Sequence, residues 1–97
     1  PAKGGSIPPG TAINMLYYTY MLKSISPGYK KTYVGYTNNL ELRLNKHNSN
    51  KGAKATKGYK WVLIYSKKFR DKNKAMSFEY KLKNNKNLRK RLLEKSL

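Results

Sequence analysis

The fold is decided by residues 17–36, which read YYTYMLKSISPGYKKTYVGY. Both ends of this stretch are rich in aromatic and branched residues, a composition that is typical of strands. Between them, Ser26-Pro27-Gly28 supplies a proline and a glycine where a tight turn needs them. We therefore predict two antiparallel strands, residues 17–25 and 31–36, that are joined as a hairpin.

A helix is expected directly after the hairpin. Four residues recur at i, i+3, i+4 and i+7 and so share one helical face. They are Leu40, Arg43, Leu44 and His47. Thr37 or Asn38 is placed to cap the first turn. Leu42 falls off this face, so we expect it to contact something else.

The second half of the chain predicts a basic loop, a third strand and two more helices. The loop covers residues 48–60, and the apolar run at 61–65 is typical of a strand that is buried on both faces. Asp71 can cap a helix at 72–83, and an asparagine-rich break separates it from a last helix whose arginines are mostly exposed. The expected class is α+β, a small, mostly antiparallel three-stranded sheet flanked by about three helices.

Length and composition limit the kind of protein. Ninety-seven residues allow one domain, which we assign to residues 15–97. Residues 1–14 are rich in Pro and Gly, which favours a disordered tail or a remnant of cloning. Cysteine is absent and histidine occurs once, which excludes a disulfide framework and a His-clustered metal site. No membrane span or secretory signal is visible, so we expect an intracellular protein, cytoplasmic or, in a eukaryotic or viral setting, nuclear.

The charge of the chain favours a polyanionic partner. Twenty-two Lys and Arg stand against four acids, which gives a net charge of +18. A solvated Lys-rich surface is the plain alternative, but nine tyrosines lie among the basic residues and offer stacking surfaces. A membrane surface fits less well, because no basic stretch has a bulky apolar face. The candidate DNA contacts lie around the basic loop and in the last helix: Lys46, Lys51, Lys54, Lys57, Lys60, Arg89 and Arg91.

Glu79 lies beside the apolar stripe of its helix, which is formed by Ala75, Phe78 and Leu82. A charge in that place is costly unless it is paired or bound to a cation. Spacing alone favours an i,i+4 ion pair with Lys83, worth about 0.2–0.5 kcal/mol. The other three acids have ordinary explanations as cap, first-turn or chain-end residues, which tilts the balance toward a divalent cation. One carboxylate leaves most positions to water and phosphate oxygens, as is common for magnesium.

Arg43, His47 and two tyrosines complete a set of groups that suits phosphodiester chemistry. Arg43 could simply extend its head from an apolar face, or bind a phosphate and the charge that builds on it during transfer. His47 could equally be a satisfied, partly buried histidine. Tyr20 and Tyr33 stand near the ends of neighbouring strands, and each alone could be a core residue. As a general base, a phenol with a pKa of about 10 needs cations around it.

These residues resemble the motifs of the GIY-YIG endonuclease domain. Its first motif is matched by Tyr18-Thr19-Tyr20, without the glycine and isoleucine, and its second by Tyr33-Val34-Gly35. Arg43 matches its helical arginine and Glu79 its glutamate. The run from Lys46-His47-Asn48-Ser49 to Thr56-Lys57-Gly58 is similar to small single-domain members, which are related to the catalytic half of structure-specific nucleases that cut branched DNA.

The resemblance implies a role for each residue. Tyr20 would position or deprotonate the attacking water, with Tyr33 sharing that task. Arg43 would bind the scissile phosphate and stabilise its transition state. His47 would join the hydrogen bonds around the nucleophile. Glu79 would hold a single divalent ion, Mg²⁺ or another such as Mn²⁺, and no small-molecule cofactor is implied.

The implied reaction is in-line hydrolysis of DNA phosphodiesters. Its substrates would be flaps, forks or other branched DNA of the kind met in DNA repair and recombination, with little sequence specificity. Gly35 would permit close backbone packing beside the site. Many members carry an asparagine at the place of Arg91, which leaves one support of the site unidentified. The alternative is a module of the same fold that binds nucleic acid and cuts poorly or waits for a protein partner; a homodimer that hides the site also agrees with the family.

Overall fold

The structure is a computed structural model that describes residues 15–26, 28 and 31–96. The expectation for residues 1–14 lies outside this part of the chain, as does Pro27 of the predicted turn. Along the chain, the elements are β1 (Tyr17–Ser24), β2 (Thr32–Thr37), α1 (Leu40–Asn48), a short 3₁₀ helix η2 (Lys54–Thr56), β3 (Trp61–Phe69), α2 (Lys72–Lys83) and α3 (Lys86–Lys95). Within the described residues, no helix is long and apolar enough to cross a membrane.

The three strands form one antiparallel sheet in the order β2-β1-β3. The central strand, β1, pairs Tyr20 with Gly35 on one side and with Ser66 on the other. The ladder to β3 shifts register between Met21 and Leu22. The predicted hairpin and the α+β class are confirmed.

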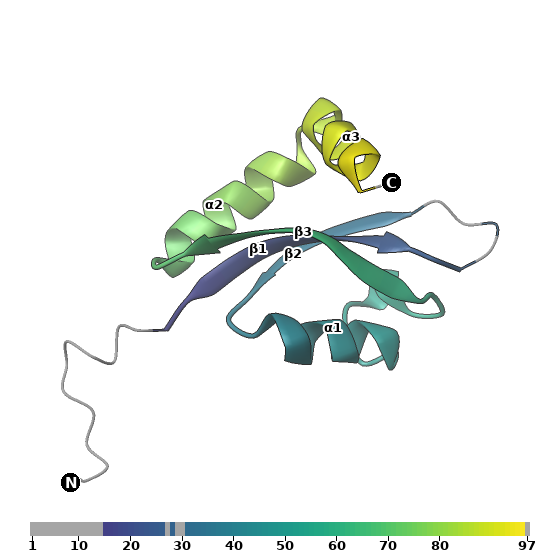
Figure 1. The fold of residues 1–97 in the computed structure, drawn as a ribbon. Coiled ribbons are helices and arrows are strands. Elements are labelled where there is room, and N and C mark those ends of the chain that lie inside the picture. The colour runs from purple at the N-terminus through teal and green to yellow at the C-terminus, as the bar shows by residue number, and fades with distance from the viewer. Residues whose placement is uncertain (1–14, 27, 29–30, 97) are drawn as a thin grey trace, which may run out of the picture.

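Side chains alternate along β1 and therefore build two small cores, one on each face of the sheet. Tyr20 packs with Trp61 and the apolar residues of α1, whereas Met21 packs with Leu82 of α2 and the leucines of α3. Figure 1 shows α1 below the sheet and the other two helices above it. Because β2 is an edge strand, groups from both layers can meet along its open side.

Two local predictions were wrong. The cap of α1 is Asn39, whose Oδ1 accepts the Leu42 N–H at 3.0 Å, and not Thr37 or Asn38. The third strand runs on to Phe69, and Leu63 within it is 40% exposed, so it is not buried on both faces. An edge strand has a neighbour on one side only, which leaves its apolar side chains less covered than those of β1.

The caps of the last two helices follow the sequence. Asp71 accepts the Asn73 N–H at 2.8 Å and begins α2 as predicted. Asn85 caps α3 by accepting the Leu88 N–H at 3.0 Å. The asparagine-rich break is therefore a cap, and its last member, Asn87, already belongs to α3.

Candidate active site at the β2 edge

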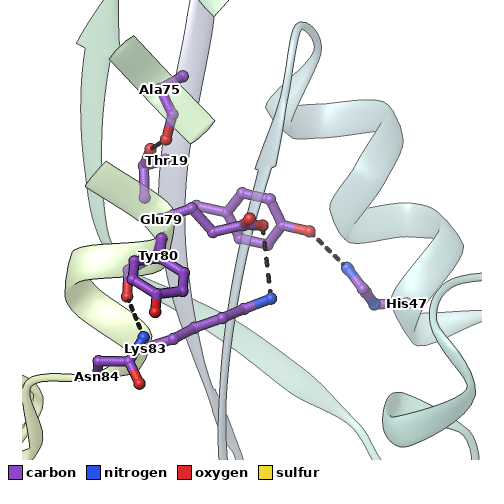
Figure 2. A network of polar contacts seen from close by, with 8 residues as sticks. Thr19, His47, Ala75, Glu79, Tyr80, Lys83 and Asn84 are labelled. Atoms are coloured by element: carbon purple, nitrogen blue, oxygen red, sulfur yellow. Dashed lines mark hydrogen bonds and ion pairs between the residues drawn. The ribbon is translucent and has the colours of Figure 1, made fainter. Parts of the chain in front are cut away.

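A chain of hydrogen bonds joins β1 to α1 and to the loop after it. Tyr20 Oη lies 2.8 Å from His47 Nε2, and the His47 end of this bond is seen in Figure 2. On the other side of the ring, Nδ1 lies 2.9 Å from Thr56 Oγ1. The Thr56 hydroxyl gives its hydrogen to the Ala53 carbonyl at 2.8 Å, so it can only accept from Nδ1–H. Nε2 is therefore the acceptor, and Tyr20 is the donor.

Two glycines let these side chains come this close. A Cβ on Gly35 would lie 2.6 Å from Tyr20 Oη, and a Cβ on Gly52 would lie 2.5 Å from His47 Nδ1. Tyr33 completes the group, with its ring centroid 4.9 Å from that of His47. A side chain at either glycine would displace the pair.

Burial sets the protonation of these rings. It raises the pKa of Tyr20 to about 12, with a contribution from Tyr33, while the Arg43 guanidinium acts in the opposite direction. Burial also raises the pKa of Tyr33, and the Arg43 guanidinium again acts to lower it. The charge of Glu79 raises the pKa of both phenols. Burial, followed by Arg43, lowers the pKa of His47. At neutral pH the site therefore holds two neutral phenols and a neutral imidazole.

The Arg43 guanidinium is held beside the phenols without a carboxylate partner. It projects from α1 one turn before His47, and its Nε is buried with no hydrogen-bond partner in the described part of the chain. In the described part of the chain, the one ion pair joins Glu79 to Lys83 and does not involve Arg43. Apart from its contact with Tyr20, the guanidinium is not held by a carboxylate, and its planar fork is suited to a phosphate.

Glu79 approaches the same edge from α2. Its Oε2 lies 3.7 Å from Lys83 Nζ, which is the i,i+4 ion pair that spacing favoured (Figure 2). Its side chain is 20% exposed, and its charge reaches Tyr20 and Tyr33, so it can be approached from solvent beside the phenols. The described residues contain no cluster of three or more His, Cys, Asp or Glu. This donor set does not make an all-protein cage, and it fits an ion such as Mg²⁺ that keeps most of its water.

Comparison with known proteins identifies the family. A model of the GIY-YIG catalytic domain matches residues 16–92. The chain belongs to the GIY-YIG family. This domain is a nuclease-type fold, and it implies that the chain binds nucleic acid.

The GIY-YIG chain has bacterial and viral relatives. The UPF0213 protein OB0043 of Oceanobacillus iheyensis is 44% identical over 68 residues, which are 69% of this chain and 76% of that protein. The uncharacterized protein L300 of Acanthamoeba polyphaga mimivirus is 45% identical over 65 residues, which are 62% of this chain and only 38% of that protein. The solution NMR structure of the UPF0213 protein BH0048 from Bacillus halodurans is 34% identical, with a TM-score of 0.45 and 84% of each chain covered.

The residues that resemble the GIY-YIG motifs come from four elements. Tyr20 comes from β1, Tyr33 and Gly35 from β2, Arg43 and His47 from α1, and Glu79 from α2. Four of the candidate DNA contacts lie exposed in the loop between α1 and β3: Lys51, Lys54, Lys57 and Lys60. Lys46 is exposed on α1 and lines a pocket together with Arg43.

The two arginines of α3 differ. Arg91 is exposed, as expected. Arg89 is half-buried, because its Nη1 donates to the Leu82 carbonyl at 2.8 Å and also to the Lys83 carbonyl. The expectation that Arg89 is mostly exposed was wrong, since its guanidinium closes the C-terminal end of α2.

Sequence reasoning missed the part played by Thr56 and Gly52. Both lie in the basic loop, whose sequence has no periodicity from which burial could be inferred. The structure shows Thr56 fully buried against His47. Sequence reasoning also missed Tyr17 and Tyr36, which line the pocket beside Arg43.

Proposed function

We propose that this protein is a metal-dependent DNA endonuclease that hydrolyses phosphodiester bonds, chiefly in branched or flap DNA. The observation that supports it most is the meeting of phenol, imidazole, guanidinium and carboxylate at one sheet edge. The phenols and the imidazole are hydrogen-bonded or in ring contact, and Arg43 and Glu79 both act electrostatically on the phenols. In a chain of net charge +18, this set suits a phosphate ester better than an uncharged substrate.

Tyr20 would act as a proton relay and would not need to become a phenolate. Its hydrogen already points at His47 Nε2, so its oxygen keeps lone pairs for a hydrogen of the attacking water. As Oη takes that proton, its own can pass to His47, which is neutral at physiological pH. Because the pKa of Tyr20 is about 12, a phenolate is scarce at neutral pH. The relay avoids the free energy of forming that phenolate before the reaction.

Arg43 and Glu79 would act on the phosphate side of the reaction. Arg43 would donate to the non-bridging oxygens, where charge builds in the transition state. Glu79 would hold the divalent ion, which when bound polarises the phosphate and stabilises the leaving oxygen. For this, the carboxylate must exchange Lys83 for the metal, and an i,i+4 pair at 3.7 Å whose lysine is exposed to solvent is weak enough to exchange.

The preference for branched DNA is supported by the likeness of residues 46–58 to small single-domain members, which are related to the catalytic half of the nucleases that cut such structures. Exposed lysines contact phosphates, which position a nucleic acid without reading its bases. Little sequence specificity is therefore expected. A non-cleaving or partner-dependent binding module is the second candidate, and the Glu79–Lys83 ion pair favours it because the carboxylate is satisfied without a metal.

Cleavage of end-labelled 5′-flap, fork and duplex DNA separates the two. The reactions contain Mg²⁺ or a chelator, and wild type is compared with Glu79→Ala and with Glu94→Ala, an exposed acid at the far end of α3. We expect Mg²⁺-dependent nicking of the branched DNA that is lost in Glu79→Ala and kept in Glu94→Ala, with nearly unchanged DNA affinity. Cutting that survives in Glu79→Ala would remove that residue from the mechanism. A folded wild type that binds but never cuts would support the binding module.

A further inference from the structure

A pocket of about 430 Å³ opens where β2 ends, next to the proposed active site. Its walls come from β1, β2, the loop after β2, α1 and the first residue of α2. None of the described residues that line it is an acid. The residues that bear on its chemistry are Tyr17, Tyr36, Leu42, Arg43, Lys46 and Lys72.

The walls of the pocket combine aromatic, apolar and cationic surface. Tyr17 and Tyr36 are half-buried, and the Tyr17 hydroxyl is held by Met15 Sδ at 3.2 Å. Leu42, which belongs to no core cluster, is 51% exposed. Aromatic faces for stacking with cations on both sides are the features with which proteins hold single-stranded nucleic acid. The volume is within the range of pockets that take small organic ligands, roughly 300–1,000 Å³.

Arg43 links this pocket to the chemistry. It lines the pocket and also lies against Tyr20, whose pKa it lowers. A phosphate bound to Arg43 would therefore carry its neighbouring nucleoside toward the pocket. Lys46 on α1 and Lys72 at the start of α2 also line the pocket, so both are placed to contact the adjoining phosphates.

We infer that the pocket receives one unpaired nucleotide of the DNA strand, the one next to the phosphate that Arg43 holds. A nucleotide within a duplex would first have to be unstacked and unpaired, which costs a few kcal/mol. A flap or fork offers such a nucleotide without that cost. The inference rests on the proposed function, and it gives the preference for branched DNA a physical origin in this chain.

The test is an affinity scan in chelator, where no cleavage occurs. One abasic site is moved through every position around the junction of a fork, and the dissociation constant is measured by fluorescence anisotropy. We expect one position at which the abasic site weakens wild-type binding by about tenfold, the usual effect of a lost stacking contact. Tyr36→Phe should keep this penalty, and Tyr36→Ala should lose it. Tyr80→Ala, which removes a 71% exposed tyrosine outside the pocket, should keep it.

A second pair of variants avoids the half-buried tyrosine. Leu42→Glu places a negative charge on an exposed wall of the pocket, and Ser77→Glu places the same charge on exposed α2 outside it. Leu42→Glu should abolish the abasic penalty, whereas Ser77→Glu should retain it. A scan that is flat in wild type, or a penalty that survives in both Tyr36→Ala and Leu42→Glu, would overturn the inference.

The failure of the inference can be told from that of the proposed function. A protein that nicks forks with Mg²⁺ but gives a flat abasic scan is a nuclease without this subsite. A protein that shows the position-specific penalty but never cuts has the subsite without the proposed activity.

Discussion

At the scale of single residues, the hydroxyl of Thr56 decides which nitrogen of His47 carries the proton. It accepts from Nδ1 because its own hydrogen is bound to the Ala53 carbonyl. Thr56→Val keeps the shape and removes the acceptor, so a buried N–H loses its partner. We expect the free energy of unfolding to fall by about 1–3 kcal/mol and the cleavage rate to fall by about tenfold or more.

The measurement is nitrogen NMR of the imidazole, which is unambiguous because His47 is the single histidine of the chain. Wild type should show the proton on Nδ1, and Thr56→Val should show a mixture of tautomers. Thr56→Ser retains the hydroxyl and should restore both the tautomer and most of the rate. A pure Nδ1–H tautomer in Thr56→Val would mean that Thr56 does not position the ring.

The neutral imidazole also predicts a pH dependence. Burial, with help from Arg43, holds the pKa of His47 below its ordinary value of 6.5. As the pH falls through 6.5, the unfolded chain takes up the proton before the native protein does. The contribution of His47 to stability is therefore present above that pH and is lost as the pH falls toward the native pKa.

Melting temperatures across this range, compared between wild type and His47→Gln, check the sign. Wild type should lose stability more steeply on the acid side than the variant. The cleavage rate should fall over the same range, since a protonated Nε2 cannot accept from Tyr20. It should not rise toward pH 10 in parallel with phenolate formation, because the pKa of Tyr20 is raised from 10.0 to about 12. A steeper loss in the variant would contradict the burial of a neutral ring.

Helical spacing predicted one face of the site and could not predict its other parts. Leu40, Arg43, Leu44 and His47 do share a face, because a period of 3.6 residues fixes that from sequence alone. The spacing of Glu79 favoured an ion pair with Lys83 over a metal ligand, and this ion pair is what the structure contains. Contacts made by an irregular loop have no periodicity to read.

At the scale of elements, the corner between α2 and α3 depends on Arg89. Its guanidinium donates to the last carbonyls of α2, where a cation is also favoured by the helix dipole. Arg89→Ala should therefore lower the free energy of unfolding by about 1–2 kcal/mol. The exposed Arg91 is a matched control that makes no such contact in the described chain, so Arg91→Ala should leave stability unchanged and weaken DNA binding.

Chemical denaturation with circular dichroism gives the two stabilities, and anisotropy gives the two affinities. Equal stability of both variants would show that the α2 carbonyls do not need Arg89. Unchanged DNA affinity in Arg91→Ala would remove α3 from the DNA-contacting surface.

Element order was predictable because turns and helix caps depend on residues that are adjacent in the sequence. Asp71 is read as a cap from its position alone, and the structure agrees. The cap of α1 was misplaced because three polar residues adjoin there. Thr37 Oγ1 accepts the Asn39 N–H at 3.1 Å, so it does not cap the helix. The Asn39 side chain caps it by accepting the Leu42 N–H. Such competition between neighbouring side chains is decided by backbone geometry, which the sequence does not display.

At the scale of the whole molecule, a net charge of +18 attracts DNA whatever its sequence or shape. This general attraction must be separated from contacts at defined places. The salt dependence of binding separates them, because each contacted phosphate releases counterions. For duplex DNA, each contact makes the negative slope of log K against log salt steeper by about 0.9. A residue that only contributes to the field changes affinity and leaves the slope almost intact.

Neutralising Lys54 and Lys57 together tests whether the basic loop contacts DNA. Both are exposed in or beside η2, the segment that also carries Thr56 against His47. We expect the slope of the double Gln variant to be shallower by about 1.8, because two phosphate contacts are lost. Its melting temperature should not change. Lys74→Gln with Lys81→Gln removes the same charge from the exposed side of α2 and should leave the slope unchanged. If both pairs lower the affinity equally and leave the slope unchanged, the lysines contribute only to the general field, and the loop makes no defined contact with DNA phosphates.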